Sequence, residues 1–172
     1  MSDISREVIS IFVSSPGDVA QERTLVERVI RRLRDEYAGI RDIQSVLWEQ
    51  QPLLASSGFQ EQIPRASDSD ILVCILWSRL GTPVGPVLRR NDGTLYSSGT
   101  EFEFEDAMRS FEANGSPKIL VYRKTADPIS SLADEKVVLD RLKQKRALDE
   151  FIAKWFIRDG VWSKNSSRPE SY

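Results

Sequence analysis

The most constraining feature of the sequence is an apolar run, Ile71-Leu-Val-Cys-Ile-Leu-Trp77, in which no polar residue alternates with the hydrophobic ones. A strand with one buried face would alternate polar and apolar residues, so a continuous run predicts a strand that is covered on both sides. Such coverage is typical of the middle of a parallel sheet with helices on both faces. The run therefore favours an α/β fold.

The rest of the chain alternates between short β-branched runs and segments with helical periodicity. We predict further strands at residues 8–13, 43–48 and 118–122, and helices at residues 19–37, 59–66, 101–111 and 136–156. Asp18 or a preceding serine is expected to cap the first long helix, and Thr100 the helix from residue 101. A hairpin is predicted in which Val87-Leu88 pairs with Leu95-Tyr96.

Strand–helix alternation with right-handed crossovers predicts a doubly wound, flavodoxin-like parallel sheet with helices on both faces. The small member of that class has strand order 2-1-3-4, to which a fifth strand could be added at an edge. We assign residues 1–160 to this domain and residues 161–172 to a disordered tail or the start of a linker.

Composition narrows the chemistry that such a domain can perform. Histidine is absent from the 172 residues and Cys74 is the single cysteine, which excludes Ser-His-Asp and Cys-His mechanisms and Cys/His zinc sites. We therefore expect no metal. The formal net charge of −2 argues against a nucleic-acid partner. A polar N-terminus and the lack of a long apolar stretch predict a cytoplasmic protein without a membrane partner.

The predicted strand order places a ligand crevice at the switch point between the first and third strands. It brings the loop Ser14-Ser-Pro-Gly-Asp18 beside Trp77-Ser-Arg79, with the helix that starts at Thr100 close by. Ser14, Ser15 and the free N–H groups of the first helix form a candidate anion or phosphate site. The alternative is a simple helix cap.

Aromatic and charged residues from the same loops complete the set of candidate substrate-binding residues. Trp48 and Trp77 are candidates to stack on a base, and Arg79 to pair with a phosphate or carboxylate. Asp18 and Ser78 accompany them in the two loops. The alternative is that these side chains pack in the core or form structural ion pairs.

Three acids in the helix that begins at the crevice are the candidate catalytic groups. Glu101, Glu103 and Glu105 alternate with Phe102 and Phe104. Residues two apart on a helix lie ~200° apart, so the three carboxylates cannot all face the same way. One should point inward, where desolvation raises the pKa of a carboxyl group and suits it to act as a nucleophile or general acid/base. The alternative is solvated acids beside core phenylalanines.

Six groups of residues form a recognisable pattern in chain order. They are Ile11-Phe-Val-Ser-Ser15 with Asp18 and Glu22-Arg23, then Trp48-Glu49, Phe59-Gln-Glu-Gln-Ile63, Asp70-Ile-Leu-Val73, Ser78-Arg-Leu-Gly81 and Thr100-Glu-Phe-Glu-Phe104. The pattern resembles the uncharacterised TIR-like domain at the N-terminus of many STAND-type NTPases. The resemblance covers about residues 8–122, and weakly residues 151–160. It implies an effector or signalling head that is clustered when a downstream NTPase domain oligomerises.

The resemblance also implies an activity. Active TIR domains cleave the N-glycosidic bond of NAD with a glutamate on the helix after the third strand, so NAD would be a substrate and no cofactor is implied. The family pattern has this glutamate four residues before a small residue, which selects Glu103 with Ala107. Glu101 is the competitor because it lies nearer the helix start. The usual tryptophan-cysteine pair ahead of the glutamate is replaced by Ser98-Gly-Thr100.

Three functions are compatible with these residues. The first is a TIR-like NAD glycohydrolase (NADase) head. The second is a protein-interaction module without catalysis, which self-associates when clustered to transmit a signal. The third is a nucleoside deoxyribosyltransferase, an enzyme that usually has further acids in the first loop, where only Asp18 is available.

Overall fold

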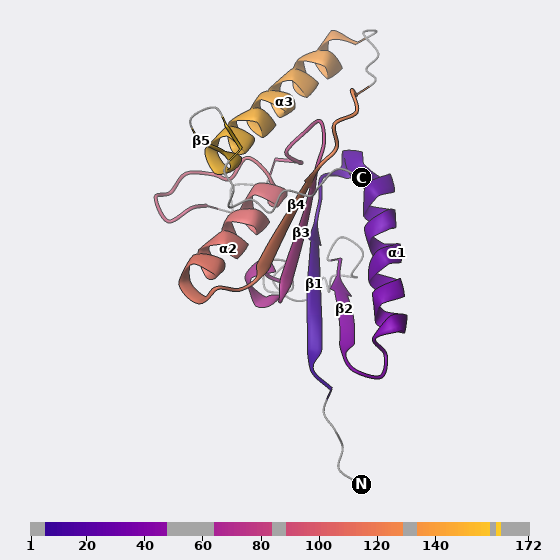
Figure 1. Cartoon of the computed structure of the whole chain (residues 1–172). Helices are drawn as coiled ribbons and strands as arrows, with labels where there is room; N and C mark the ends of the chain where they lie inside the picture. Colours follow the sequence, from indigo (N-terminus) through magenta and orange to yellow (C-terminus); the bar gives the residue numbers. More distant parts are fainter. Residues whose placement is uncertain (1–5, 48–63, 84–88, 129–133, 159–160, 163–172) are drawn as a thin grey trace, which may run out of the picture.

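Four parallel strands in the order β2-β1-β3-β4 form the centre of the molecule (Figure 1). The computed structural model describes residues 6–47, 64–83, 89–128, 134–158 and 161–162. The strands of the sheet are β1 (Val8–Ser14), β2 (Asp42–Val46), β3 (Ile71–Leu76) and β4 (Lys118–Arg123). The helices are η1 (Gly17–Val19), α1 (Ala20–Glu36), η4 (Ala66–Asp68), α2 (Gly99–Asn114) and α3 (Glu135–Phe156).

Two layers of helix cover the two faces of the sheet, as the apolar run in β3 predicts. α1 lies on one face, and α2 and α3 lie on the other (Figure 1). Because successive strand side chains point to opposite faces, Val13 and Ile75 pack in the α1 layer while Phe12 and Leu76 pack in the α2/α3 layer. The chain thus has the predicted α/β, flavodoxin-like arrangement with helices on both faces.

The long helices match their predicted ranges to within a few residues, but both predicted caps are wrong. Neither η1 nor α1 has a side-chain cap, because the Asp18 carboxylate accepts hydrogen bonds from the loop after β3 instead. α2 is capped by Ser98, two residues before Thr100, and its hydroxyl accepts the Glu101 N–H at 3.1 Å. α2 ends at Asn114, and its C-cap residue Gly115 has a left-handed φ of 74°.

Several other predicted elements fall wholly or partly outside the described residues. These are Trp48, most of the short helix at 59–66, the Val87-Leu88 arm of the hairpin, and residues 163–172. The described part of the hairpin has an antiparallel bridge between Arg89 and Leu95. No fifth strand joins the sheet within the described ranges. There, β5 (Ile157–Arg158) and β6 (Val161–Trp162) pair only with each other.

Candidate functional site

A buried carboxylate, Glu103, lies against the carboxyl end of β1. The Ser14 hydroxyl, on the last residue of β1, donates to Glu103 Oε2 at 2.5 Å. Glu103 is 7% exposed and Ser14 is 1% exposed, so the pair is almost fully removed from solvent. Buried ionisable groups with specific partners at the carboxyl edge of a parallel sheet are typical of catalytic sites in this class of fold.

Cys74 is the third member of this cluster. It is the β3 residue paired in register with Ser14 of β1, and its side chain is fully buried. Burial raises the pKa of the Cys74 thiol, the nearby Glu103 charge raises it further, and a hydrogen bond with Ser14 opposes the change. Because the thiolate is the nucleophilic form, Cys74 is a weakly polar neighbour of the carboxylate rather than a nucleophile.

Glu101, the alternative candidate for the catalytic glutamate, stabilises the start of α2. Its carboxylate accepts the Ser97 N–H at 2.7 Å and pairs with Arg90 at 2.8 Å, while its own N–H is capped by Ser98. This reciprocal arrangement resembles a capping box, in which an acid at the third helical position folds back to the residues before the helix. Of the two acids, the structure brings Glu103 to the end of β1.

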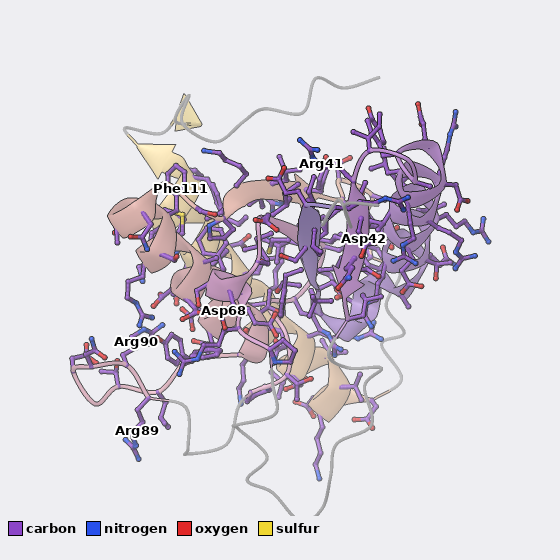
Figure 2. All side chains as sticks on the ribbon, turned by 90° about the horizontal axis from the view of Figure 1, so that it is seen from below. Arg41, Asp42, Asp68, Arg89, Arg90 and Phe111 are labelled. Carbon is purple, nitrogen blue, oxygen red and sulfur yellow. The ribbon has the colours of Figure 1, made fainter. Side chains whose placement is uncertain are left out.

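Glu105 belongs to a separate ionic network on the surface of α2. Burial by itself would raise the pKa of Glu105, but hydrogen bonds from Arg90 and Lys154 outweigh burial and the pKa is lowered. The Arg90 guanidinium also lies over the Tyr96 ring, 4.4 Å from its centroid. In Figure 2, Arg90 lies beside α2, whereas the neighbouring Arg89 points away from it. The network ties the loop after β3 to α2 and α3.

The loops after β1 and β3 meet at the switch point, as predicted. Asp18 Oδ2 accepts the Ser78 N–H at 3.1 Å and the Ser78 hydroxyl at 2.7 Å. Arg79 Nε lies 3.8 Å from Asp18 Oδ1, and neither of these two buried atoms has a hydrogen-bond partner. The Arg79 guanidinium also rests on Gly17, where an added Cβ would be 2.8 Å from Nη2. Asp18 therefore locks the two loops together, and Arg79 lies beside them.

Ser15 is held by α1 and is not an open anion site. Its hydroxyl accepts Arg23 Nε at 2.8 Å, and its carbonyl accepts Arg23 Nη2 at 3.1 Å. The Val19 N–H is likewise used by the Pro16 carbonyl at 3.3 Å. The predicted phosphate site at the start of the first helix is thus largely occupied by contacts within the protein.

Trp77 does not join Glu103. It packs with the α1-side cluster, while Glu103 and Ser14 belong to the α2 side. Its indole N–H donates to the Ala126 carbonyl at 2.5 Å, and Lys124 Nζ lies 3.9 Å from its ring centroid. The predicted partner in base stacking, Trp48, lies outside the described residues.

The sequence did not predict the roles of three residues that shape this region. The sequence places Cys74 only within the apolar run of residues 71–77, and its alignment with Ser14 depends on the register between β1 and β3. Arg23 could have been found, since it lies one helical turn into α1 and can reach back to the preceding loop. The local sequence around Arg90 does not predict its ion pairs, because the partners Glu101 and Glu105 lie 11 and 15 residues later, on α2.

Comparison with known proteins assigns the chain to a family. The chain belongs to the family described as "Domain of unknown function (DUF4062)", whose model matches residues 10–168. No curated protein and no solved structure matches the sequence. Within the described ranges no helix is long and apolar enough to cross a bilayer, and no group of three or more His, Cys, Asp or Glu side chains is placed to hold a metal ion.

Proposed function

We propose that the chain is a TIR-like effector domain that cleaves the N-glycosidic bond of NAD, with Glu103 as the catalytic carboxylate. One observation carries the proposal. Glu103 is buried and hydrogen-bonded to Ser14 where β1 ends, beside β3, which is the crevice position of an α/β sheet. The family resemblance selected this glutamate, and Glu101 is engaged elsewhere.

The chemistry needs a carboxylate and no histidine. Glu103 would lie beneath the anomeric carbon and stabilise an oxocarbenium-like transition state, or trap it covalently. The bond to the nicotinamide nitrogen breaks, and its electron pair leaves with a neutral nicotinamide, so no general acid is required. Water then adds to the anomeric carbon and gives ADP-ribose and a proton.

The neighbouring residues have distinct parts in this proposal. Ser14 orients the carboxylate through its 2.5 Å hydrogen bond. Asp18 and Ser78 fix the two loops that meet at the switch point. Arg79, whose side chain is 38% exposed, is the cation available to pair with the pyrophosphate.

A protein-interaction module without catalysis is the second candidate, and the burial of Glu103 favours it. A carboxylate that is 7% exposed and already bonded to Ser14 behaves as a structural group unless the substrate displaces part of its cover. In both cases the resemblance to TIR-like domains implies a head attached to a STAND-type NTPase. A P-loop pattern in sequence that follows Tyr172 would support that setting.

The test is nicotinamide release from NAD by the purified chain, both free and fused to an oligomerising partner that clusters it. We expect release from the clustered form and none from Glu103→Gln. The matched control is Glu101→Gln, which changes an equally buried carboxylate two residues away and should retain activity despite a less stable α2. No release from either wild-type form would reject the glycohydrolase and leave the interaction module. Equal loss in both variants would reject the assignment to Glu103.

A further inference from the structure

An apolar groove runs between α1 and β4, on the sheet face opposite Glu103. It has a volume of about 470 Å³. Leu25 and Val26 of α1 form one wall, Tyr122 of β4 forms the other, and Ile75 of β3 lies between them. Of the described helices, α1 alone covers this face, and β4 lies beyond it at the edge of the sheet (Figure 1).

The walls of the groove are unusually exposed for apolar side chains in a parallel sheet. Leu25 and Tyr122, which line the groove, are 57% and 43% exposed, and Val29, one turn further along α1 and outside the lining, is 57% exposed. Parallel sheets are normally covered by helices on both faces, and contiguous exposed apolar surface marks interaction sites. A small-molecule pocket would enclose its lining, whereas these half-exposed walls suit a broad partner such as a helix.

The side of α1 that carries Leu25 and Val29 has two exposed arginines, with one acid, Glu36, at the end of the helix. Arg28 and Arg32 follow Leu25 and Val29 by three residues, so they lie along the same side of α1. Both are exposed, and neither has an ion pair among the described residues. The acid within the groove, Glu22, is already paired with Lys124 at 2.7 Å.

We propose that this groove binds an amphipathic α-helix of a partner protein, with its apolar side against Leu25, Val29 and Tyr122 and with acidic residues facing Arg28 and Arg32. This is the helix-in-groove mode of recognition, with charge complementarity setting the choice of partner. The inference does not depend on the proposed catalysis, because the groove and Glu103 lie on opposite faces of the sheet.

A second copy of this chain fits the groove less well. A second copy offers α1 itself, which would bring its Arg28 and Arg32 against the same arginines, and the first half of α3, where Val137, Leu139 and Leu142 are 44–50% exposed. Both acids and bases border this segment, with Glu135 and Asp140 beside Lys136 and Lys143. The segment therefore lacks the uniformly acidic flanks that would complement Arg28 and Arg32.

The test uses the full chain and a fluorescent synthetic 18-residue peptide with leucines at helical spacing and glutamates on both flanks. Matched peptides have lysine in place of glutamate, or the same residues in scrambled order. By fluorescence anisotropy we expect the acidic peptide to bind at least tenfold more tightly than either control, and more weakly as salt is raised. Leu25→Asp with Val29→Asp should weaken binding at least tenfold. Arg28→Glu with Arg32→Glu should reverse the preference toward the lysine peptide.

The controls keep the proposal falsifiable. Leu142→Asp replaces a comparably exposed leucine on α3 and should leave binding unchanged, and circular dichroism should show every variant folded. The proposal is overturned if the acidic and basic peptides bind alike, or if Leu142→Asp costs as much as the groove variants. It is also overturned if sedimentation shows a dimer that Leu25→Asp dissociates, since a second copy would then be the occupant.

Discussion

Ser14 donates a hydrogen bond to the buried carboxylate of Glu103, so its loss should lower the stability of the fold. Ser14→Ala would leave Glu103 Oε2 without this donor in a site that is almost fully removed from solvent. We expect the free energy of unfolding to fall by about 1–3 kcal/mol in urea titrations. In a Glu103→Met background the same change should cost under about 1 kcal/mol, because no carboxylate remains to be satisfied. Equal costs in the two backgrounds would show that the hydrogen bond is not the cause.

Gly81 is the residue at which the loop after β3 most needs glycine. Its φ is 131°, and an added Cβ would lie 3.1 Å from both Ser98 Cβ and Thr100 Oγ1 at the start of α2. Gly81→Ala should therefore destabilise the protein by roughly 1–3 kcal/mol. Gly39→Ala is the matched control, because nothing lies within 4 Å of its added Cβ, and it should change stability by about 0.5 kcal/mol or less. Thermal unfolding of the two variants makes the comparison, and similar midpoints would contradict it.

At the scale of elements, Glu105 connects α2 to α3 and to the loop after β3, and the connection depends on pH. Its Oε2 accepts Arg90 Nε at 3.1 Å, and its Oε1 pairs with Lys154 at 2.7 Å. Because these contacts lower the folded-state pKa of Glu105 below the ordinary value of about 4.3, they stabilise the fold above that pH. The stabilisation is lost as pH falls through the folded-state pKa.

Glu105→Gln tests this dependence. The variant should be less stable than the wild type by about 1–2 kcal/mol at pH 7, and the difference should shrink as pH is lowered below about 4. Glu112→Gln changes an exposed carboxyl group near the end of the same helix and serves as the control. Chemical unfolding between pH 3 and pH 7 measures both differences. A Glu105→Gln deficit that does not change over this range would contradict the ionic link.

Elements were easier to predict than the contacts between them. The periods of α1 and α3 and the apolar run of β3 are local signals, so their ranges could be predicted closely. The cap of α2 was misplaced because Ser98 and Thr100 are both good capping residues, and the choice is made by the Leu80 carbonyl, which accepts the Ser98 hydroxyl at 3.0 Å. This hydrogen bond joins residues 18 positions apart, so the local sequence around Ser98 does not predict it.

At the scale of the whole molecule, the alternation of strands and helices was enough to predict the strand order. That order correctly placed the loop of Asp18 beside that of Ser78. The strand order did not predict which face of the sheet each side chain occupies. Trp77 and Glu103 lie on opposite faces and therefore do not meet. The face depends on the register of each strand end, since a shift of one residue reverses every side chain. The grouping of Glu103 with Cys74 likewise follows from register.

Phe104 joins α2 to α3 in the helical layer opposite α1, and its loss should weaken that layer. Its ring makes edge contacts with Phe151, Trp155 and Phe156 of α3, with centroids 5.0–5.6 Å away, and it is 1% exposed. Phe104→Ala should cost about 3–5 kcal/mol. Phe111→Ala removes the same ring from the same helix at a site that is 40% exposed, and should cost far less. If α3 is held mainly by this cluster, hydrogen exchange in Phe104→Ala should rise first in α3 while α1 and β2 stay protected. A simultaneous rise in all elements would instead show that the two faces of the sheet unfold as one unit.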